Sequence, residues 1–372
     1  MWTIFHTEAS MGWGGQEIRI LSESMGMRER GHRVIIIAPS SSFLNKKAAR
    51  QGFEVIPVSF EKKDYLLNYF KILKLIEDKK PNFINTHSSK DSWVVSLAAR
   101  FSKYKPFLIR TRHLSTPVAQ NVMGSLIYKW LPHKIITTGK TIKEQLIERN
   151  RVSADKITSI PTGIDLNLFN PNNAYKNIRN ELSLPDQTPL VGMVSVLRSW
   201  KGHNYFIEAA DLISQKLPDV KFLIVGDGPQ KENLKRLVKE KELSDIIIFT
   251  GHRDDVPKIM ASLDMLVHPS YANEGIPQSI IQGMAMSVPV VTSDLTALTE
   301  IVADRETGLI VPQKNSAQLA KKIMLLLKDK ELAQKLGDNG RKLVLEKFSM
   351  EKMINSTEEL YKRIERSLSS QV

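Results

Sequence analysis

The sequence is most informative at Tyr271-Ala272-Asn273-Glu274-Gly275-Ile276-Pro277-Gln278-Ser279-Ile280-Ile281-Gln282-Gly283-Met284-Ala285, where a loop opens into a helix. Pro277 suits the first helical position, because its missing N–H costs nothing there. The free N–H groups of Gly275, Ile276 and the first turn would form an anion-binding site, strengthened by the helix dipole. Glu274 would lie at the mouth of this site and accept hydrogen bonds from ligand hydroxyls, and Gln282 would reach a second part of the same ligand.

Outward from this stretch, short strand-like runs alternate with helical segments in two series. The first series lies near residues 3–7, 33–38, 53–58, 82–87, 107–111 and 134–138, and the second near 190–196, 221–225, 246–249, 265–268, 288–291 and 308–311. Alternation of this kind predicts parallel sheets covered by helices. We therefore expect an α/β fold with two Rossmann-like parallel-sheet domains that face a cleft, and ligands at the carboxyl ends of the strands.

The length of 372 residues fits two domains. We place an N-terminal domain at residues 1–168, a linker rich in Asn and Pro at 169–188, and a C-terminal domain at 189–349. The sequence has no Cys, which excludes disulfides and cysteine-ligated zinc. No run approaches the roughly 18 apolar residues that indicate a membrane-spanning helix.

Positive charge is concentrated in the N-terminal part of the chain. Residues 1–170 hold 26 Lys and Arg against 14 Asp and Glu, a net charge of +12, and residues 171–372 hold 27 against 26, a net charge of +1. An excess of positive charge of this size bears on which molecules the protein binds and not on its fold. The first half is therefore expected to meet an anionic lipid surface, a phosphorylated acceptor or nucleic acid, unless it is simply a basic soluble surface.

The order Glu-Gly-x-Pro-x-x-x-x-Gln-x-Met-Ala, followed by Val-Pro-Val-Val at 288–291, resembles the Glu-x7-Glu signature of the retaining nucleotide-sugar glycosyltransferases of family 4. These enzymes have the GT-B fold, in which the last helix, about 350–372 here, crosses back onto the N-terminal domain. In the family the first Glu faces the donor sugar and the second holds the ribose. This sequence has Gln282 at the second position, which keeps hydrogen-bonding capacity and loses the charge.

Two further motifs support the resemblance. Gly14 and Gly15 follow the first strand, where the family has a Gly-Gly loop beside the donor diphosphate. Arg198 and Lys201 follow the first strand of the second domain, as in the family's Arg…Lys-Gly element. Two such cations suit a diphosphate leaving group, because fixed positive charge stabilises negative charge as it develops.

Other strand ends add weaker donor-side candidates. Gly251 and Arg253 lie in the loop that contacts the nucleotide base in the family. Glu300 matches a Glu near the donor sugar and phosphate, although residues 295–299 replace the glycines that usually precede it. Family members work without a bound metal, so the resemblance implies no metal and no cofactor beyond the nucleotide-sugar donor, which we expect to carry UDP.

His87, Arg112 and His113 are the acceptor-side candidates in the first domain. The strand predicted at 107–111 ends in an Arg-x-Arg-His run whose last residue is His113. The family often has a His at this place, close to the donor sugar and acceptor. Its ordinary pKa near neutrality would allow it to assist proton transfer. His87 also ends a strand.

The resemblance implies a retaining glycosyltransferase that moves a sugar from a nucleotide diphosphate to a hydroxyl of a glycan or lipid-linked acceptor, in cell-envelope polysaccharide or lipopolysaccharide biosynthesis. Glu274, Arg198, Lys201 and His113 are the expected catalytic residues. We expect a cytoplasmic protein that also contacts the inner face of an anionic membrane through its basic N-terminal domain, and no nucleic-acid partner. Two alternatives remain open: a GT-B sugar-nucleotide epimerase or hydrolase, and a non-catalytic nucleotide-binding protein.

The segment 62–80 combines aromatic, aliphatic and Lys residues in a helical pattern. It could lie on a membrane surface. It could equally pack on the sheet with its Lys residues directed outward, so the sequence leaves both interpretations open.

Overall fold

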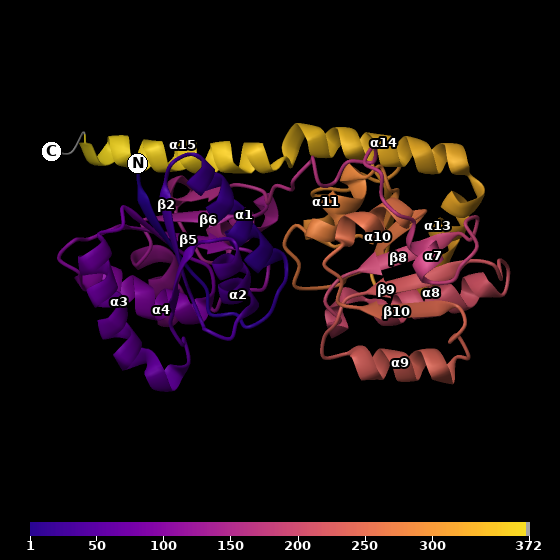
Figure 1. Cartoon of the computed structure of the whole chain (residues 1–372), viewed down its shortest axis with the longest axis horizontal. Helices are drawn as coiled ribbons and strands as arrows, with labels where there is room; N and C mark the ends of the chain where they lie inside the picture. The colour runs from indigo at the N-terminus through magenta and orange to yellow at the C-terminus, as the bar shows by residue number, and fades with distance from the viewer. Residues whose placement is uncertain (370–372) are drawn as a thin grey trace. The chain divides into compact units, whose positions relative to one another are not determined.

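The computed structural model describes residues 1–369, which divide into two compact units (Figure 1). Unit 1 comprises Met1–Gly163 and the C-terminal helix that begins at Met350, and unit 2 comprises Ile164–Ser349. Each unit contains one parallel sheet with helices on both faces, which confirms the predicted α/β class with two Rossmann-like domains. No helix within residues 1–369 has both the length and the apolarity needed to cross a bilayer.

The sheet of unit 1 has seven parallel strands in the order β3-β2-β1-β4-β5-β6-β7. Its central strands are apolar on both sides, as buried parallel strands require. In β2, for example, Ile35 and Ile37 face one core cluster while Ile36 faces the other. The strands are β1 (Thr3–Thr7), β2 (Arg33–Ala38), β3 (Glu54–Pro57), β4 (Phe83–Thr86), β5 (Phe107–Arg112), β6 (Lys134–Thr137) and β7 (Ile157–Ser159).

Two groups of helices cover this sheet. One face packs against α1 (Gly15–Glu29), α2 (Phe43–Arg50) and α15 (Met350–Ser369), and the other against α3 (Tyr65–Lys79) and α4 (Ser89–Phe101). Shorter helical elements complete the unit: η1 (Lys62–Asp64), α5 (Val122–Ser125), η2 (Leu126–Trp130), α6 (Lys140–Glu148) and η3 (Ala154–Lys156).

Helix α15 lies where the resemblance places a crossover helix. Its residues Met353, Ile354 and Tyr361 are buried in the same cluster as β1 and α1. The C-terminal helix is therefore part of the core of unit 1, although it follows unit 2 in the sequence. The last three residues of the predicted segment, 370–372, lie outside the described residues.

The sheet of unit 2 has six parallel strands in the order β10-β9-β8-β11-β12-β13. Helices α8 (His203–Ser214), α9 (Lys231–Glu240) and α13 (Ser316–Lys328) cover one face. The other face packs against α7 (Ile178–Glu181), α10 (Val256–Ser262), α11 (Gln278–Ala285), α12 (Thr296–Thr299) and α14 (Lys330–Lys347). The strands are β8 (Leu190–Val194), β9 (Lys221–Val225), β10 (Ile247–Gly251), β11 (Met265–His268), β12 (Val290–Ser293) and β13 (Leu309–Val311), and a short η4 (Ser199–Lys201) follows β8.

The segment 169–188, predicted as a linker, is a packed part of unit 2. Phe169 and Ile178 are buried in the core beside α11 and α14. Arg179 donates to Asp264 across 2.6 Å and to the carbonyl oxygen of Ser262 across 2.7 Å. The polar composition of the segment 169–188 therefore comes from surface turns that flank a few buried residues.

Candidate functional site

The loops that follow β8, β9 and β10 hydrogen-bond to one another at the carboxyl edge of the unit 2 sheet. The backbone N–H of Leu197 donates to the carbonyl oxygen of Asp227 across 3.0 Å, and that of Gly226 donates to Gly251 across 2.8 Å. These contacts hold the predicted cation-bearing loop against its neighbours. Hydrogen bonds between the loops therefore fix the backbone that leads into the segment with Arg198 and Lys201.

Gly202 brings the loop after β8 close to the loop after β11. Its φ is +83°, a conformation that L side chains rarely adopt, and an added Cβ would lie 2.2 Å from the carbonyl oxygen of Pro269. The N–H of Tyr271 donates to the carbonyl oxygen of Trp200 across 2.9 Å and closes the same junction. The glycine of the Arg…Lys-Gly element thus allows Lys201 to reach the Glu274 loop.

Lys201 and Glu274 form the polar centre of unit 2. The Lys201 ammonium lies 2.6 and 2.9 Å from the two carboxylate oxygens of Glu274, whose residue is 3% exposed. Nε2 of the buried His268 lies 3.4 Å from Oε1 of the same carboxylate. Burial alone would raise the pKa of Glu274, but the Lys201 charge and the His268 hydrogen bond outweigh it and lower this pKa to about 2. Glu274 is thus a fixed carboxylate at neutral pH.

Arg198 is exposed, and its backbone carbonyl oxygen accepts from the N–H of Lys201 across 3.1 Å. Its guanidinium carbon lies 5.3 Å from the centre of the Trp200 ring, and it forms no ion pair with any described residue. A stacked Arg keeps its hydrogen-bonding edge free for an anion. Arg198 and Lys201 therefore present two cations, one open and one held by Glu274.

The helix that carries the opening motif begins one residue later than predicted. Helix α11 starts at Gln278, and Pro277 is its N-cap with extended backbone. Gly275 and Ile276 are buried in the loop before it, and Gln282 is half-buried one turn after Gln278. Glu300, predicted near the donor sugar, is half-buried directly after α12.

Arg253 is bound within an ion-pair cluster. Its guanidinium donates to Asp255 across 2.7 Å and also to Glu181, and these hydrogen bonds raise the pKa of Arg253. The expected contact of Arg253 with a nucleotide would have to displace these carboxylates. Gly251 has a φ of +71° and faces open space, so the loop itself leaves room for a ligand.

In unit 1, the predicted Gly-Gly loop begins helix α1. The backbone N–H of Gly14 donates to Oε2 of Glu17 across 2.9 Å, and Gly15 is exposed. The nearby Glu8, which was not predicted from the sequence, accepts from the N–H of Ser10 across 2.7 Å. Burial, with the negative charges of Asp91 and Glu17, raises the pKa of Glu8 to about 8. An acidic residue directly after a buried strand was the available signal.

His87 and His113 are in direct contact, with 3.0 Å between Nδ1 of His87 and Nε2 of His113. Nε2 of His87 lies 2.9 Å from Nδ1 of His6, a residue that sequence analysis did not select. All three rings are buried, and burial lowers the pKa of each below its usual value. The structure thus joins both predicted histidines in one row.

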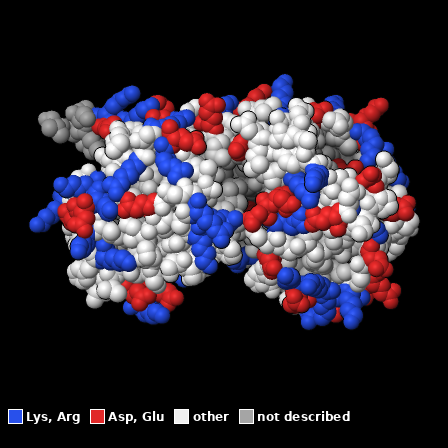
Figure 2. Space-filling model, in the orientation of Figure 1, with Lys and Arg blue, Asp and Glu red and all other residues white. Residues whose placement is uncertain are grey.

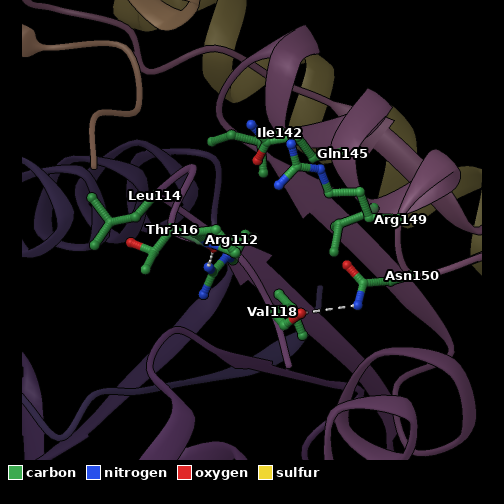
Figure 3. A pocket seen from close by; sticks show the side chains of 10 residues that line it. Arg112, Leu114, Thr116, Val118, Ile142, Gln145, Arg149 and Asn150 are labelled. Carbon is green, nitrogen blue, oxygen red and sulfur yellow. Dashed lines mark hydrogen bonds between the residues drawn. The ribbon is translucent and has the colours of Figure 1, made fainter. Parts of the chain in front are cut away.

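Arg112 lines a small pocket between the loop after β5 and helix α6, together with Leu114, Gln145 and Arg149 (Figure 3). Its guanidinium donates to the carbonyl oxygen of Thr116. This pocket gives unit 1 a second set of cations near His113. In the described part of the chain, no three His, Asp or Glu side chains cluster in a way that could hold a metal ion.

Two family models match the chain, one in each half. Residues 13–168 match Glycosyltransferase Family 4, and residues 174–343 match Glycosyl transferases group 1. Together they leave only the two ends and a short central segment unmatched. Their order agrees with the resemblance derived from the motifs.

Curated relatives match over most of their length. The UDP-Gal:alpha-D-GlcNAc-diphosphoundecaprenol alpha-1,3-galactosyltransferase of Escherichia coli is 27% identical over 78% of this chain and 77% of its own. An uncharacterized glycosyltransferase of Haemophilus influenzae is 26% identical over 92% and 94%. The N,N'-diacetylbacillosaminyl-diphospho-undecaprenol alpha-1,3-N-acetylgalactosaminyltransferase of Campylobacter jejuni is 24% identical over 84% and 87%.

Solved structures agree with the fold over nearly the whole chain. A glycosyltransferase from Rickettsia africae has a TM-score of 0.85 at 24% identity and covers 98% of both chains. Anabaena Alr3699/HepE in complex with UDP and glucose has a TM-score of 0.86 at 19% identity and covers 97% of this chain and all of its own. They confirm the predicted fold class, two Rossmann-like domains of the GT-B type.

Proposed function

Since the chain belongs to the glycosyltransferases, with a Glycosyltransferase Family 4 domain followed by a group 1 domain, we propose that it transfers a sugar from a UDP-sugar to a hydroxyl of a lipid-linked saccharide, with retention at the anomeric carbon. The observation that carries this proposal is the Lys201–Glu274 pair beside the open Arg198. It combines a carboxylate for the sugar with cations for a diphosphate.

UDP is the nucleotide named for two of the similar proteins. The Escherichia coli relative is named for UDP-Gal, and the Anabaena structure contains UDP. In this chain, Arg198 can bind phosphate oxygens with two N–H groups and Lys201 adds a point charge. Because these side chains supply the positive charge, we expect UDP to bind without a metal ion.

The proposed reaction replaces one C–O bond by another and transfers one proton. The acceptor hydroxyl oxygen bonds to the anomeric carbon as the bond from that carbon to the diphosphate oxygen breaks. The bonding electrons leave with the diphosphate, and the hydroxyl proton passes to a diphosphate oxygen on the same face of the sugar. Arg198 and Lys201 stabilise the leaving group, because they are positioned before its charge develops.

Glu274 is suited to orient the donor sugar. With a pKa of about 2 it cannot act as a proton donor at neutral pH, and its two oxygens are already held by Lys201. A fixed carboxylate can still accept hydrogen bonds from sugar hydroxyls through its remaining lone pairs. We therefore assign it to binding and orientation of the sugar.

The acceptor is proposed to be lipid-linked because two relatives are named for diphosphoundecaprenol acceptors. Such an acceptor lies in a membrane, and unit 1 carries a suitable surface. Helices α3 and α4 pack side by side and expose large apolar residues among Lys side chains, and Figure 2 shows Lys and Arg over this unit. We define the α3–α4 surface by Leu66, Leu67, Phe70, Leu97, Phe101 and Tyr104.

Thermal unfolding in the presence of nucleotides tests the donor assignment. UDP should raise the midpoint more than GDP, ADP or CMP, and the rise should persist in EDTA. A ligand at about a hundredfold its Kd adds roughly 2.7 kcal/mol to the free energy of unfolding. A rise with another nucleotide only, or with none, would contradict the UDP assignment.

Product analysis then separates transfer from the alternatives. We expect sugar transfer to a diphosphate-linked lipid saccharide, with the same anomeric configuration in donor and product by NMR. Release of UDP without any acceptor would indicate a hydrolase or epimerase instead. Inversion at the anomeric carbon would contradict retention.

A further inference from the structure

Three histidines form a continuous row across unit 1. His6 lies in β1, His87 directly follows β4 and His113 directly follows β5, and these strands are neighbours in the sheet. The distances between ring nitrogens are 2.9 Å from His6 Nδ1 to His87 Nε2, and 3.0 Å from His87 Nδ1 to His113 Nε2. Both are ordinary hydrogen-bond lengths, so each contact has one donor and one acceptor.

His6, the least exposed histidine of the row, faces an ion pair. His6 Nε2 lies 4.0 Å from Oε1 of Glu23, and Oε2 of Glu23 lies 3.5 Å from Nε of Arg19. Both charged side chains are fully buried on α1. Arg19 is fixed in turn, because it donates to the carbonyl oxygen of Ile160 across 2.8 Å and to the hydroxyl of Thr162 across 3.2 Å.

The ion pair determines which ring nitrogen of each histidine carries the proton. A carboxylate paired with a guanidinium accepts hydrogen bonds and does not donate them. His6 therefore keeps its proton on Nε2, facing Glu23, since the other tautomer would direct a lone pair at the carboxylate. Its Nδ1 must then accept from His87 Nε2, and His87 Nδ1 must accept from His113 Nε2.

We propose that Glu23 and the row His6–His87 hold His113 in the tautomer protonated on Nε2, with a bare Nδ1 that accepts a hydrogen bond from a substrate hydroxyl. His6, His87 and Glu23 are thus positioning residues. Within residues 1–369 no group hydrogen-bonds to Nδ1 of His113. His113 is also the most accessible of the three, 7% exposed against 1% for His6 and 3% for His87.

The neutral state of the row supports this assignment. Burial lowers the pKa of all three histidines, and the nearby Arg19 charge lowers each further, so none carries a proton on both nitrogens at neutral pH. A cationic ring would break the alternation of donors and acceptors. The role of Nδ1 toward a substrate rests on the proposed function, whereas the tautomer itself does not.

NMR of the full chain, labelled with 15N-histidine, tests the tautomer without substrate. Long-range correlations between ring nitrogens and carbons distinguish the two tautomers, and His113→Asn identifies the signals of His113 by difference. His133 is an internal reference, because the N–H of Leu108 donates to its Nδ1 across 2.8 Å and so keeps its proton on Nε2. His113 should show the same pattern as His133. Protonation of His113 on Nδ1 would overturn the proposal.

Glu23→Gln tests whether the Glu23 carboxylate sets the tautomers of the three histidines. Without the carboxylate, His113 should become a mixture of tautomers while His133 stays unchanged. His6→Phe keeps a ring of similar size and leaves the Arg19–Glu23 pair, and it should have the same effect if Glu23→Gln does not fold. A folded variant in which the tautomer of His113 is unchanged would overturn the proposal.

Kinetics separates positioning from a purely structural effect. Glu23→Gln should lower kcat/KM for the acceptor about tenfold, as the loss of one neutral hydrogen bond to the substrate does, while the Kd for UDP stays within about twofold. A loss of turnover with an unchanged tautomer would show that Glu23 acts only on the fold. A protein that never transfers sugar would contradict the proposed function, and the NMR result would still decide the tautomer.

Discussion

Glu274 shows how two neighbours can reverse the effect of burial on a single residue. A carboxylate that is 3% exposed would ordinarily resist ionisation, yet Lys201 and His268 keep it charged. The result is a carboxylate whose position is defined before any ligand arrives. Preorganised polar groups need no reorganisation at the moment of reaction.

Removal of this charge should strongly reduce transfer and spare the fold. We expect Glu274→Gln to reduce kcat/KM by roughly 100-fold or more, because an oriented charged contact is lost at the reacting sugar. UDP should still raise the unfolding midpoint, since Arg198 is unaffected. Glu240→Gln, which breaks an exposed ion pair with Arg236 on α9, is the matched control and should change turnover little. Near-normal turnover in Glu274→Gln would contradict the site.

Glu8 should make the stability of the protein depend on pH. Its pKa is raised in the folded state to about 8 from an ordinary 4.5, so between these values the unfolded chain has lost a proton that the folded chain keeps. Stability is thus lost as pH rises through this window. Glu8→Gln removes the effect, and its melting temperature should gain on that of the wild type from pH 4.5 to 8 and level off above.

The measurement is the change with pH in the difference between the two melting temperatures. Glu232→Gln, an exposed carboxylate on α9, is the control and should show no such trend. A difference that stays constant across the window would show that Glu8 ionises normally in the folded protein.

At the scale of elements, helix α14 depends on one close backbone contact. A Cβ on Gly337 would lie 2.1 Å from the carbonyl oxygen of Ser287, whereas a Cβ on Gly340 would meet only the flexible side chain of Met284, at 3.1 Å. Ala favours both helical positions equally by about 1 kcal/mol. The pair therefore isolates the effect of packing.

We expect Gly337→Ala to lower the free energy of unfolding by about 1–3 kcal/mol, as overpacking typically does. Gly340→Ala should leave it unchanged or raise it slightly. Urea unfolding of the two variants measures the difference. Equal stabilities would mean that α14 can shift away from Ser287 at no cost.

Helix α3 packs on the sheet, as one interpretation of its sequence predicts, and its exposed edge is compatible with the other interpretation. Asn68, Ile72 and Ile76 are buried against unit 1, while Leu66 and Leu67 are each 72% exposed. The helix therefore packs on the sheet and still presents an apolar edge among Lys residues. An edge of this composition suits the interface of an anionic membrane.

The double variant Leu67→Asp, Phe70→Asp should bind anionic vesicles several-fold more weakly than the wild type, because apolar area and favourable charge are both lost. Co-sedimentation with phosphatidylglycerol vesicles measures this, and phosphatidylcholine vesicles show the contribution of charge. Leu345→Asp on α14, also exposed, is the control. Unchanged binding of the double variant would exclude the α3–α4 surface as the contact.

At the scale of the whole molecule, the two units differ in how the chain builds them. Unit 2 is one continuous stretch with a core on each face of its sheet. Unit 1 needs α15, whose Tyr361 packs against Trp2 and Phe83. Truncation should therefore affect the two units unequally.

Residues 164–349 expressed alone should unfold cooperatively and bind UDP, because the Lys201–Glu274 pair and Arg198 lie within this stretch. Residues 1–163 alone should be poorly soluble, since the face that α15 covers would be exposed. Calorimetry and UDP titration of the first fragment measure the outcome. A folded fragment that does not bind UDP would place the donor site outside unit 2.

The sequence predicted where those candidate site residues lie whose positions depend on local chemistry. Gly202 and Glu274 could be located because glycines, strand ends and helix starts leave signals over a few residues. The start of α11 was misplaced by one residue because Pro277 is equally compatible with the N-cap and the first turn. Arg253 looked free for a nucleotide because its partner Glu181 lies 72 residues away.

By itself the sequence predicted the strands of both sheets except the short β7, the α/β class and the loops that bear the candidate site residues, because apolar periodicity and turn chemistry act over short stretches. Only the tertiary structure decided the row His6–His87–His113, the raised pKa of Glu8 and the pairing of Lys201 with Glu274. These depend on the strand order, which places β4 between β1 and β5, and β8 beside β11. Strand order brings residues far apart in the sequence within hydrogen-bond distance, and burial then changes their charge.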